Sequence, residues 1–213
     1  IVLGEAIFGD NVTWRTYSLS SLSTTIRAYD LTGPPKIHRL GDAVWTDGGL
    51  YTAWVDRDTT VDAPHYKLVI SRYDAATSSW TAPETIDSEV LGDVTLLNID
   101  NDICACYRRL STPVGHEQLC FSRNSGGGWA DRDDVPVIDG ALGFTIGSPH
   151  MAEYAGNPVI IYAYINTATP ASNIIKHATT TNGGTTWSTA DTILVSHGGG
   201  DDILDTCCRV ISI

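Results

Sequence analysis

The chain is poor in positive charge and contains no long hydrophobic run. Its 213 residues include 13 Lys and Arg against 25 Asp and Glu, which gives a formal net charge of −12. Binding to nucleic acid or to an anionic membrane requires Lys and Arg to displace counterions, so this balance argues against both. No run approaches the roughly eighteen apolar residues of a membrane-spanning helix. We therefore expect no nucleic-acid partner and no membrane span.

Cysteine is scarce, and its spacing is not that of a metal site. The chain has an odd number of cysteines, five: Cys104, Cys106, Cys120, Cys207 and Cys208. Cys104 and Cys106 are two residues apart on a predicted strand and therefore share a face. Buried free thiols are the favoured interpretation, and a disulfide from either of them to Cys120 is the alternative. We expect no metal and no cofactor; calcium near the acidic loops stays an option, although their spacing is not that of a calcium-binding loop.

Helical periodicity is almost missing, and a short turn motif occurs twice instead. Residues 122–129 and 180–187 both read hydroxyl-x-Asn-x-Gly-x-x-Trp. The hydroxyl and the Asn amide can bond the backbone of the turn, and the Gly accepts a positive φ. The Trp can pack the hairpin onto its neighbour. We predict a structural role for eight residues: Ser122, Asn124, Gly126, Trp129, Thr180, Asn182, Gly184 and Trp187.

The sequence around these motifs repeats as well. An apolar segment enters each turn, a segment rich in Tyr, Val and Ile precedes it, and a Gly-led segment comes before that, starting at Gly41, Gly92 and Gly147. Four strands in a unit of about fifty residues is the arrangement of a β-propeller blade. We predict an all-β, single-domain propeller of four-stranded antiparallel blades, about four in this chain: residues 37–88, 89–140 and 141–197, and an incomplete or composite blade from residues 198–213 with residues 1–36.

The two ends of the chain allow two arrangements. Residues 203–213 read as the first strand of a further blade, and residues 1–20 read as the back half of one. The two ends could complete one blade between them and close a small ring. The alternative is a portion of a larger propeller with five to seven blades.

The repeated motif resembles the Asp-box, or BNR repeat, of sialidases and related β-propellers, with Asn where Asp is usual. The resemblance covers roughly residues 37–196. His38-Arg39-Leu40-Gly41, ahead of a strand and a hairpin, is similar to the aromatic-Arg-Ile-Pro opening of sialidases, although Leu-Gly stands in place of Ile-Pro. The resemblance implies that Arg39 is the first of three arginines that bind a substrate carboxylate. It implies by loop position that Asp62 is the acid. These two are the catalytic candidates, and no Tyr–Glu nucleophile pair is identified.

Four residues are candidates for binding a ligand. Arg39 could hold an anion bidentately, with Asp56 nearby. Trp45 at a strand end could stack on a sugar, and His150 is expected on a first strand that faces the central channel. Each also has a structural alternative: an ion pair of Arg39 with Asp42 or Asp56, a packed indole, and a hydrogen-bonded structural His.

These features favour a non-catalytic recognition module over an enzyme. A propeller presents variable loops on a rigid rim, which suits binding of a glycan or a protein, as in a viral fibre or a secreted adhesin. The expected location is extracellular, secreted or virion-associated. One alternative is a fragment of a sialidase-type glycoside hydrolase. The other is a structural component that assembles with other chains or with the rest of a longer parent chain.

Overall fold

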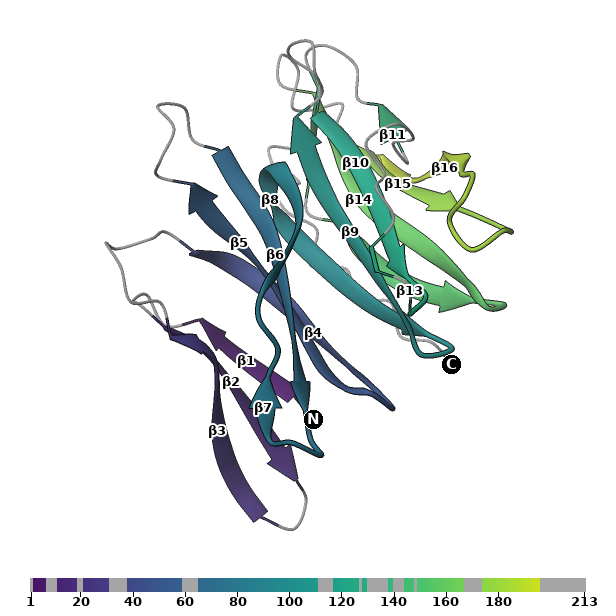
Figure 1. The fold of residues 1–213 in the computed structure, drawn as a ribbon. Coiled ribbons are helices and arrows are strands. Elements are labelled where there is room, and N and C mark those ends of the chain that lie inside the picture. Colours follow the sequence, from purple (N-terminus) through teal and green to yellow (C-terminus); the bar gives the residue numbers. More distant parts are fainter. Residues whose placement is uncertain are drawn as a thin grey trace.

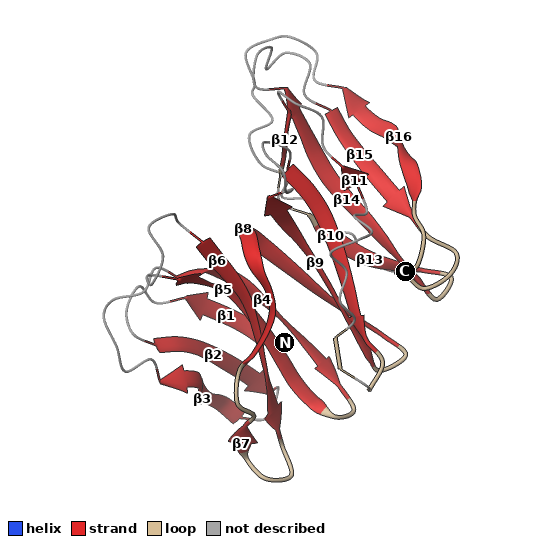
Figure 2. Cartoon of the chain, turned by 45° about the horizontal axis from the view of Figure 1, so that its top comes forward, coloured by secondary structure: helices blue, strands red, loops and turns tan. Residues whose placement is uncertain are grey.

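The protein is all-β in the part of the chain that the structure describes. The computed structural model describes residues 2–6, 11–18, 21–30, 38–58, 65–110, 117–126, 128–129, 138–139, 144–147, 149–166 and 174–195. These residues form strands and turns without a helix (Figure 2). No helix long and apolar enough to cross a membrane is present among them. The predicted all-β class with antiparallel sheets is confirmed.

The strands form three antiparallel sheets (Figure 1). The first contains β1 (Val2–Ala6), β2 (Asn11–Ser18) and β3 (Ser21–Asp30). The second has the order β11-β10-β9-β8-β6-β5-β4, with β7 paired to β6. Its strands are β4 (His38–Thr46), β5 (Gly49–Asp58), β6 (His65–Asp74), β7 (Ser79–Trp80), β8 (Glu84–Ile99), β9 (Asp102–Leu110), β10 (Glu117–Asn124) and β11 (Ile138–Asp139). The third has the order β12-β14-β15-β16, with β13 paired to β14. Its strands are β12 (Phe144–Ile146), β13 (His150–Tyr154), β14 (Asn157–Asn166), β15 (Ile174–Thr179) and β16 (Ser188–Val195).

One long strand, β8, belongs to two four-stranded groups. Its first half pairs with β6 as far as Val90, and its second half pairs with β9 from Val90 to Ile99, so that Val90 pairs with both strands. The register shifts on both sides of Gly92, where Gly92 has φ 131° and Asp93 has φ 50°. A bulge of this kind bends a strand and increases its twist. The large sheet therefore divides at this point into two groups of strands.

We name three units by their strands. The first unit is β4, β5, β6 and residues 84–90 of β8, with β7 at its end. The second unit is residues 92–99 of β8 with β9, β10 and β11. The third unit is β12 to β16. The three units are stacked one after another, and the β1–β3 sheet lies on the other side of the first unit (Figure 1).

The hydrophobic core lies in two layers between the units. The first layer joins the first and second units and includes Leu68, Ile70 and Tyr107. The second layer joins the second and third units and includes Phe121, Ile160 and Tyr162. Alternate residues of a strand point to opposite faces, so β9 sends Ala105 and Tyr107 to the first layer and Cys104 and Cys106 to the second. The second unit is therefore buried on both faces.

Each repeated turn is closed by its own polar side chains. Oγ1 of Thr180 accepts hydrogen bonds from the backbone N–H groups of Asn182 and Gly184 at 3.3 and 3.2 Å. Oδ1 of Asn182 accepts one from the N–H of Thr186 at 2.9 Å. In the first motif, Oδ1 of Asn124 accepts one from the N–H of Gly126 at 2.9 Å. These bonds satisfy backbone groups that the turn takes out of the strand ladder.

The two motif tryptophans occupy matching places in the stack. Trp187 packs edge-on against Phe121 of the preceding unit, with 5.1 Å between the ring centroids. Trp129 packs against the first layer, between the first and second units. Each indole therefore fills the layer between its own unit and the one before it.

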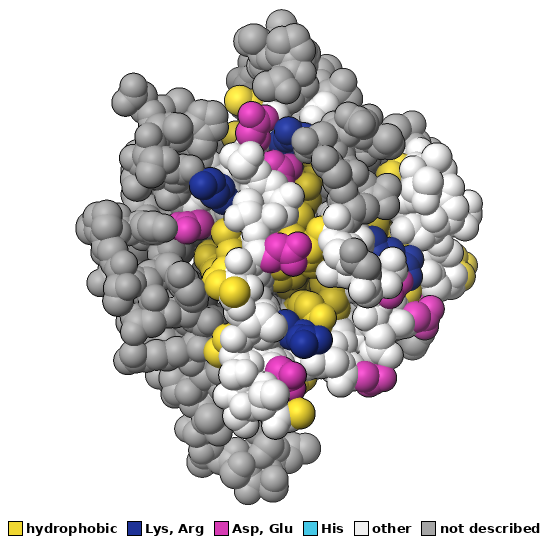
Figure 3. All heavy atoms as spheres, in the orientation of Figure 1, with side chains coloured by type: hydrophobic (Ala, Val, Ile, Leu, Met, Phe, Trp, Pro, Cys, Tyr) yellow, Lys and Arg dark blue, Asp and Glu magenta, His cyan; other side chains and the backbone are white. Residues whose placement is uncertain are grey.

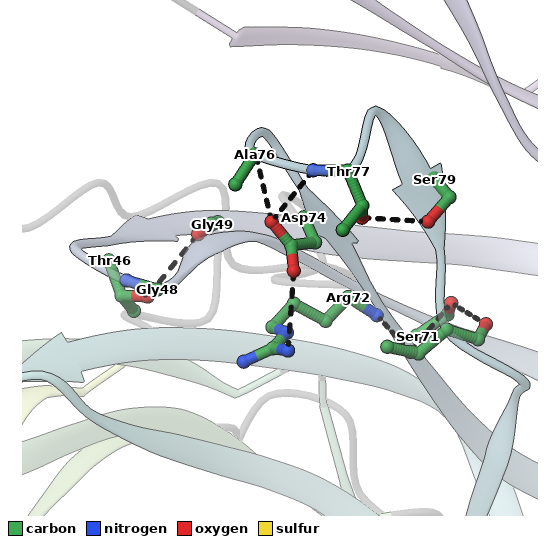
Figure 4. Close-up of polar contacts among 10 residues, drawn as sticks. Thr46, Gly48, Gly49, Ser71, Arg72, Asp74, Ala76, Thr77 and Ser79 are labelled. Carbon is green, nitrogen blue, oxygen red and sulfur yellow. Dashed lines mark hydrogen bonds and ion pairs between the residues drawn. The ribbon is translucent and has the colours of Figure 1, made fainter.

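The matching turn of the first unit uses a carboxylate instead. Oδ1 of Asp74 accepts hydrogen bonds from the N–H groups of Ala76 and Thr77 at 2.8 and 3.4 Å (Figure 4). Oγ of Ser71 donates to the carbonyl of Thr81 at 2.8 Å. Ser71 and Trp80 are nine residues apart, whereas the hydroxyl residue and the Trp of each repeated motif are seven apart, so the sequence predicts two extra residues around Asp74. The turn there is a four-residue connection, residues 75–78.

The three described cysteines are free and buried. Cys104, Cys106 and Cys120 form no disulfide. Cys120 lies opposite Tyr107 in the register and packs in the first layer, whereas Cys104 and Cys106 pack in the second. The alternative of a bridge to Cys120 is therefore wrong, because the strand alternation sends the thiols to opposite faces. Cys207 and Cys208 lie outside the described residues.

A pair of glycine substitutions tests the packing of the turns. Gly184 and Gly126 hold the same motif position with φ +96° and +88°, but a Cβ at Gly184 would overlap the ring of Phe121, whereas at Gly126 nothing lies within 4 Å. We expect Gly126→Ala to lower the free energy of unfolding by about 1 kcal/mol through backbone strain alone. Gly184→Ala adds the overlap, for a total of about 3 kcal/mol. Urea unfolding measures both, and equal losses would contradict the packing.

Thiol labelling tests the burial of the second unit. Burial raises the pKa of Cys104 to about 12 and that of Cys106 well above its usual value. Because the thiolate is the nucleophile, we expect iodoacetamide near pH ~8 to leave Cys104, Cys106 and Cys120 unmodified in the folded protein. Peptide mass mapping with and without urea gives the readout. Labelling of Cys106 in the folded protein at the rate seen in urea would show that the layer is open.

Candidate functional site

Strands β4 and β5, β8 and β9, and β13 and β14 each meet in a hairpin, and the three hairpins lie at the same end of the structure. Their turns are residues 47–48, 100–101 and 155–156. Strand β8 contacts both β4 and β13, so the hairpin of the second unit lies between the other two (Figure 1). We call residues 45–48, 98–101 and 153–156 the hairpin face.

Three polar residues hold the same position on the first strand of each hairpin, that is on β4, β8 and β13, which we call the inner strands. Asp42 lies opposite Ala53, Thr95 opposite Cys106, and His150 opposite Ile161; each of these pairs is the same distance from its hairpin turn. They come together in the structure. Oγ1 of Thr95 donates to Oδ2 of Asp42 at 3.3 Å, and the charge of His150 acts on the same carboxylate.

The carboxylate of Asp42 joins the inner strands of two units. Its Oδ2 accepts a hydrogen bond from the N–H of Leu96 in β8 at 2.7 Å, and its Oδ1 accepts one from the N–H of Ala43 at 2.8 Å. Burial raises the pKa of Asp42 above its ordinary value of 3.8, although these hydrogen bonds, Thr95 and His150 oppose the change. Asp42 therefore acts as a clamp between β4 and β8, with both oxygens engaged inside the protein.

A second polar network ties the hairpins themselves. Nδ2 of Asn98 donates to the carbonyl of Trp45 at 2.8 Å. Nδ2 of Asn101 donates to Oδ2 of Asp47 at 2.8 Å, and Oδ1 of Asn101 accepts from the N–H of Asp47 at 3.1 Å. These bonds fix the backbone on which the indole of Trp45 stands, and 42% of that residue is exposed. Tyr154 on the third hairpin is 77% exposed. The face thus combines exposed aromatic rings with oriented amides.

Two arginines at the opposite end of the inner strands were not identified from the sequence. Arg108 donates from Nη1 to the carbonyl of Ile146 at 2.7 Å and from Nη2 to Asp93 at 2.8 Å. Oε2 of Glu117 lies 3.7 Å from Nη1 and accepts from the N–H of Ile146 at 2.7 Å. Arg108 and Glu117 together therefore hold both backbone polar groups of Ile146, which pins the third unit to the second.

The next residue, Arg109, does the same at the junction of the first and second units. Its Nη2 lies 3.3 Å from Glu89 and its Nε lies 3.5 Å from Asp87. Burial, followed by the charge of Asp87, raises the pKa of Tyr107, which shares a hydrogen bond with that carboxylate. Both guanidinium groups are engaged with carboxylates of the protein. The signal that was available is an Arg-Arg pair directly after a buried strand.

The structure separates the ligand-binding candidates. Arg39 lies near the start of β4 opposite Val55, and Asp56 lies opposite His38 near the end of β5. Trp45 lies near the other end of β4, in the hairpin face. His150 begins β13 and lies between these ends, close to Asp42. The side chain of Arg39 and the whole of Asp62 lie outside the described residues.

No charged patch of one sign is seen on the face drawn in Figure 3. Basic and acidic side chains are scattered there over the described residues, with hydrophobic side chains visible between them. Within the described part of the chain, no group of three or more His, Cys, Asp or Glu is placed to hold a metal ion. The calcium option was prompted by the acidic segments at residues 56–58 and 131–134. The second segment and the side chains of residues 57–58 lie outside the described residues.

The titration of Asp42 can be tested with Asp42→Asn, which keeps the shape of the side chain and removes its charge. Because the pKa of Asp42 is raised in the folded protein, the folded state binds more protons than the unfolded state above pH 3.8. The stability of the wild type relative to the variant should therefore fall as the pH rises from 3.8 through the folded value. Urea unfolding at a series of pH values measures this difference. A difference that stays constant or rises would contradict the assignment.

A scan with protein-family models and a search of curated proteins found no match to this chain. The role of the clamp and of the hairpin face is therefore inferred from their own chemistry.

Proposed function

We propose that this chain is a β-propeller recognition module that binds a glycan through the hairpin face. The observation that carries the proposal is the exposed indole of Trp45, standing on backbone fixed by Asn98 and beside the Asp47–Asn101 pair. An aromatic ring can stack on the apolar face of a sugar, while amide and carboxylate groups bond its hydroxyls. Groups already held in place lose little freedom on binding, which favours affinity.

The propeller part of the proposal is supported by the way the units repeat. Three antiparallel units follow one another and pack through their faces. The equivalent inner-strand residues Asp42, Thr95 and His150 converge, as first strands do around a propeller axis. The resemblance of the two turn motifs to the Asp-box agrees with this architecture. Further blades would come from the remaining residues or from a longer parent chain.

Binding at the hairpin face fits the structure better than hydrolysis at the other end of the strands does. A sialidase-type hydrolase would use the end at which Arg39 and Asp56 lie, with a free arginine cluster and an acid held near a nucleophile. The described guanidinium groups of Arg108 and Arg109 there are engaged with carboxylates of the protein. We therefore place the ligand at the hairpin face, and an extracellular or virion surface is where such a module would meet it.

Trp45→Ala tests the proposal. We expect binding on a glycan array, and we expect Trp45→Ala to weaken the best ligand at least about tenfold in titration calorimetry, since the stacking surface is removed. Leu110→Ala is the matched control, because Leu110 is 45% exposed but ends β9 away from its hairpin. It should bind within about twofold of the wild type.

Three results would count against the proposal. The first is silence of the wild type on the array, and the second is unchanged binding by Trp45→Ala. The third is turnover of a fluorogenic sialoside, which would favour the hydrolase.

A further inference from the structure

The most exposed large hydrophobic side chain among the described residues is on the third hairpin. Tyr154 is 77% exposed, and Trp45 on the first hairpin is 42% exposed. The hairpin of the second unit, with Asn98 and Asn101, lies between them, because β8 contacts both β4 and β13 (Figure 1). Sheets packed face to face are about 10 Å apart. Two aromatic residues on either side of the second unit are therefore farther apart than one sugar ring can reach.

The charge on this face is acidic. Asp47, Asp100 and Glu153 are all exposed there. Oδ2 of Asp47 is hydrogen-bonded to an uncharged amide, and no ion pair between the described residues involves Asp100 or Glu153.

Two described cations lie near these turns, and both are paired. Arg72 lies 4.0 Å from Asp74, and Arg123 lies 2.7 Å from Asp102. An anionic ligand would therefore meet three carboxylates, and each of these two guanidinium groups already faces a carboxylate of the protein. At physiological salt such repulsion acts over about 8 Å, which covers a ligand in contact with the face.

We infer that the hairpin face binds an extended, uncharged oligosaccharide across Trp45, the Asn98–Asn101 amides and Tyr154, and excludes sialylated and sulfated glycans. This rests on the proposed glycan-binding function and gives it a ligand class. One sugar stacks on each aromatic ring, and the units between them bond the amides of the second hairpin. The selectivity is opposite to that of a carboxylate-binding site, because carboxylates stand where arginines would be needed.

The test uses N-acetyllactosamine oligomers of increasing length, each with and without a terminal sialic acid. We expect affinity to rise with length until both aromatic rings are covered. We expect the sialylated form of each oligomer to bind at least about fivefold more weakly at low salt, with the gap closing in about 0.5 M NaCl as the charges are screened. Tyr154→Ala should weaken the long oligomers and leave the shortest one within about twofold.

A charge variant isolates the electrostatic part. Asp100→Asn with Glu153→Gln keeps both shapes, and Asn tolerates the positive φ of 52° at position 100. We expect this double variant to bring the affinity ratio of sialylated to neutral oligomer to within about twofold of one. Glu84→Gln is the control, since it removes an exposed carboxylate from the start of β8, and it should leave the ratio of the wild type unchanged.

The outcomes separate this inference from the proposed function. Binding that depends on Trp45 but prefers sialylated oligomers, or does not grow with length, overturns the inference and leaves glycan binding standing. An unchanged ratio in the double variant also overturns it. Absence of binding to any oligomer in this series and to the glycan array overturns both.

Discussion

Burial of the second unit on both faces is the constraint on which the rest of the structure depends. Its strands alternate so that Ala105 and Tyr107 fill one layer while Cys104 and Cys106 fill the other. A sheet of this composition cannot be stable in water on one side, so it requires both neighbours. The shared strand β8 provides the first neighbour through its bulge at Gly92, and the motif tryptophan Trp187 seals the second against Phe121.

The units pack through the faces of their sheets, so the edge strands of neighbouring units are joined by side chains and not by a backbone ladder. The inner strands β4 and β8 contact each other without forming a ladder, so their backbone groups need other partners. Asp42 accepts a hydrogen bond from the N–H of Leu96 at mid-strand, and Asn98 and Asn101 bond backbone groups of Trp45 and Asp47 at the hairpins. At the opposite end, Arg108 and Glu117 bond the backbone of Ile146 in β12. These contacts fix the relative positions of the hairpins, and that rigidity suits the proposed binding role.

Much of the fold could be predicted because its signals are local. Patterns a few residues long are enough to predict the turn motifs and the apolar strands that enter them. They also predict that the cysteines lie on strands. The junction at β8 was harder: the sequence suggests one unit that ends at residue 88 and a new segment that begins at Gly92, whereas the structure has one bulged strand across both. The clamp was harder still, since the partners Asp42 and Leu96 are 54 residues apart, and no local pattern reports such a pair.

The Asp-box-like turns and the proposed binding face use different residues. The polar atoms of Thr180 and Asn182 are hydrogen-bonded within their own turn, and the ring of Trp187 packs in the core against Phe121. The scaffold alone therefore explains the motif. The motif does not restrict which ligand the hairpin face would hold. In the proposed binding role, specificity would reside in positions such as Trp45 and Glu153, which no packing layer uses. Substitution there changes what is recognised at little cost in stability, because an exposed hairpin residue contributes little to the core.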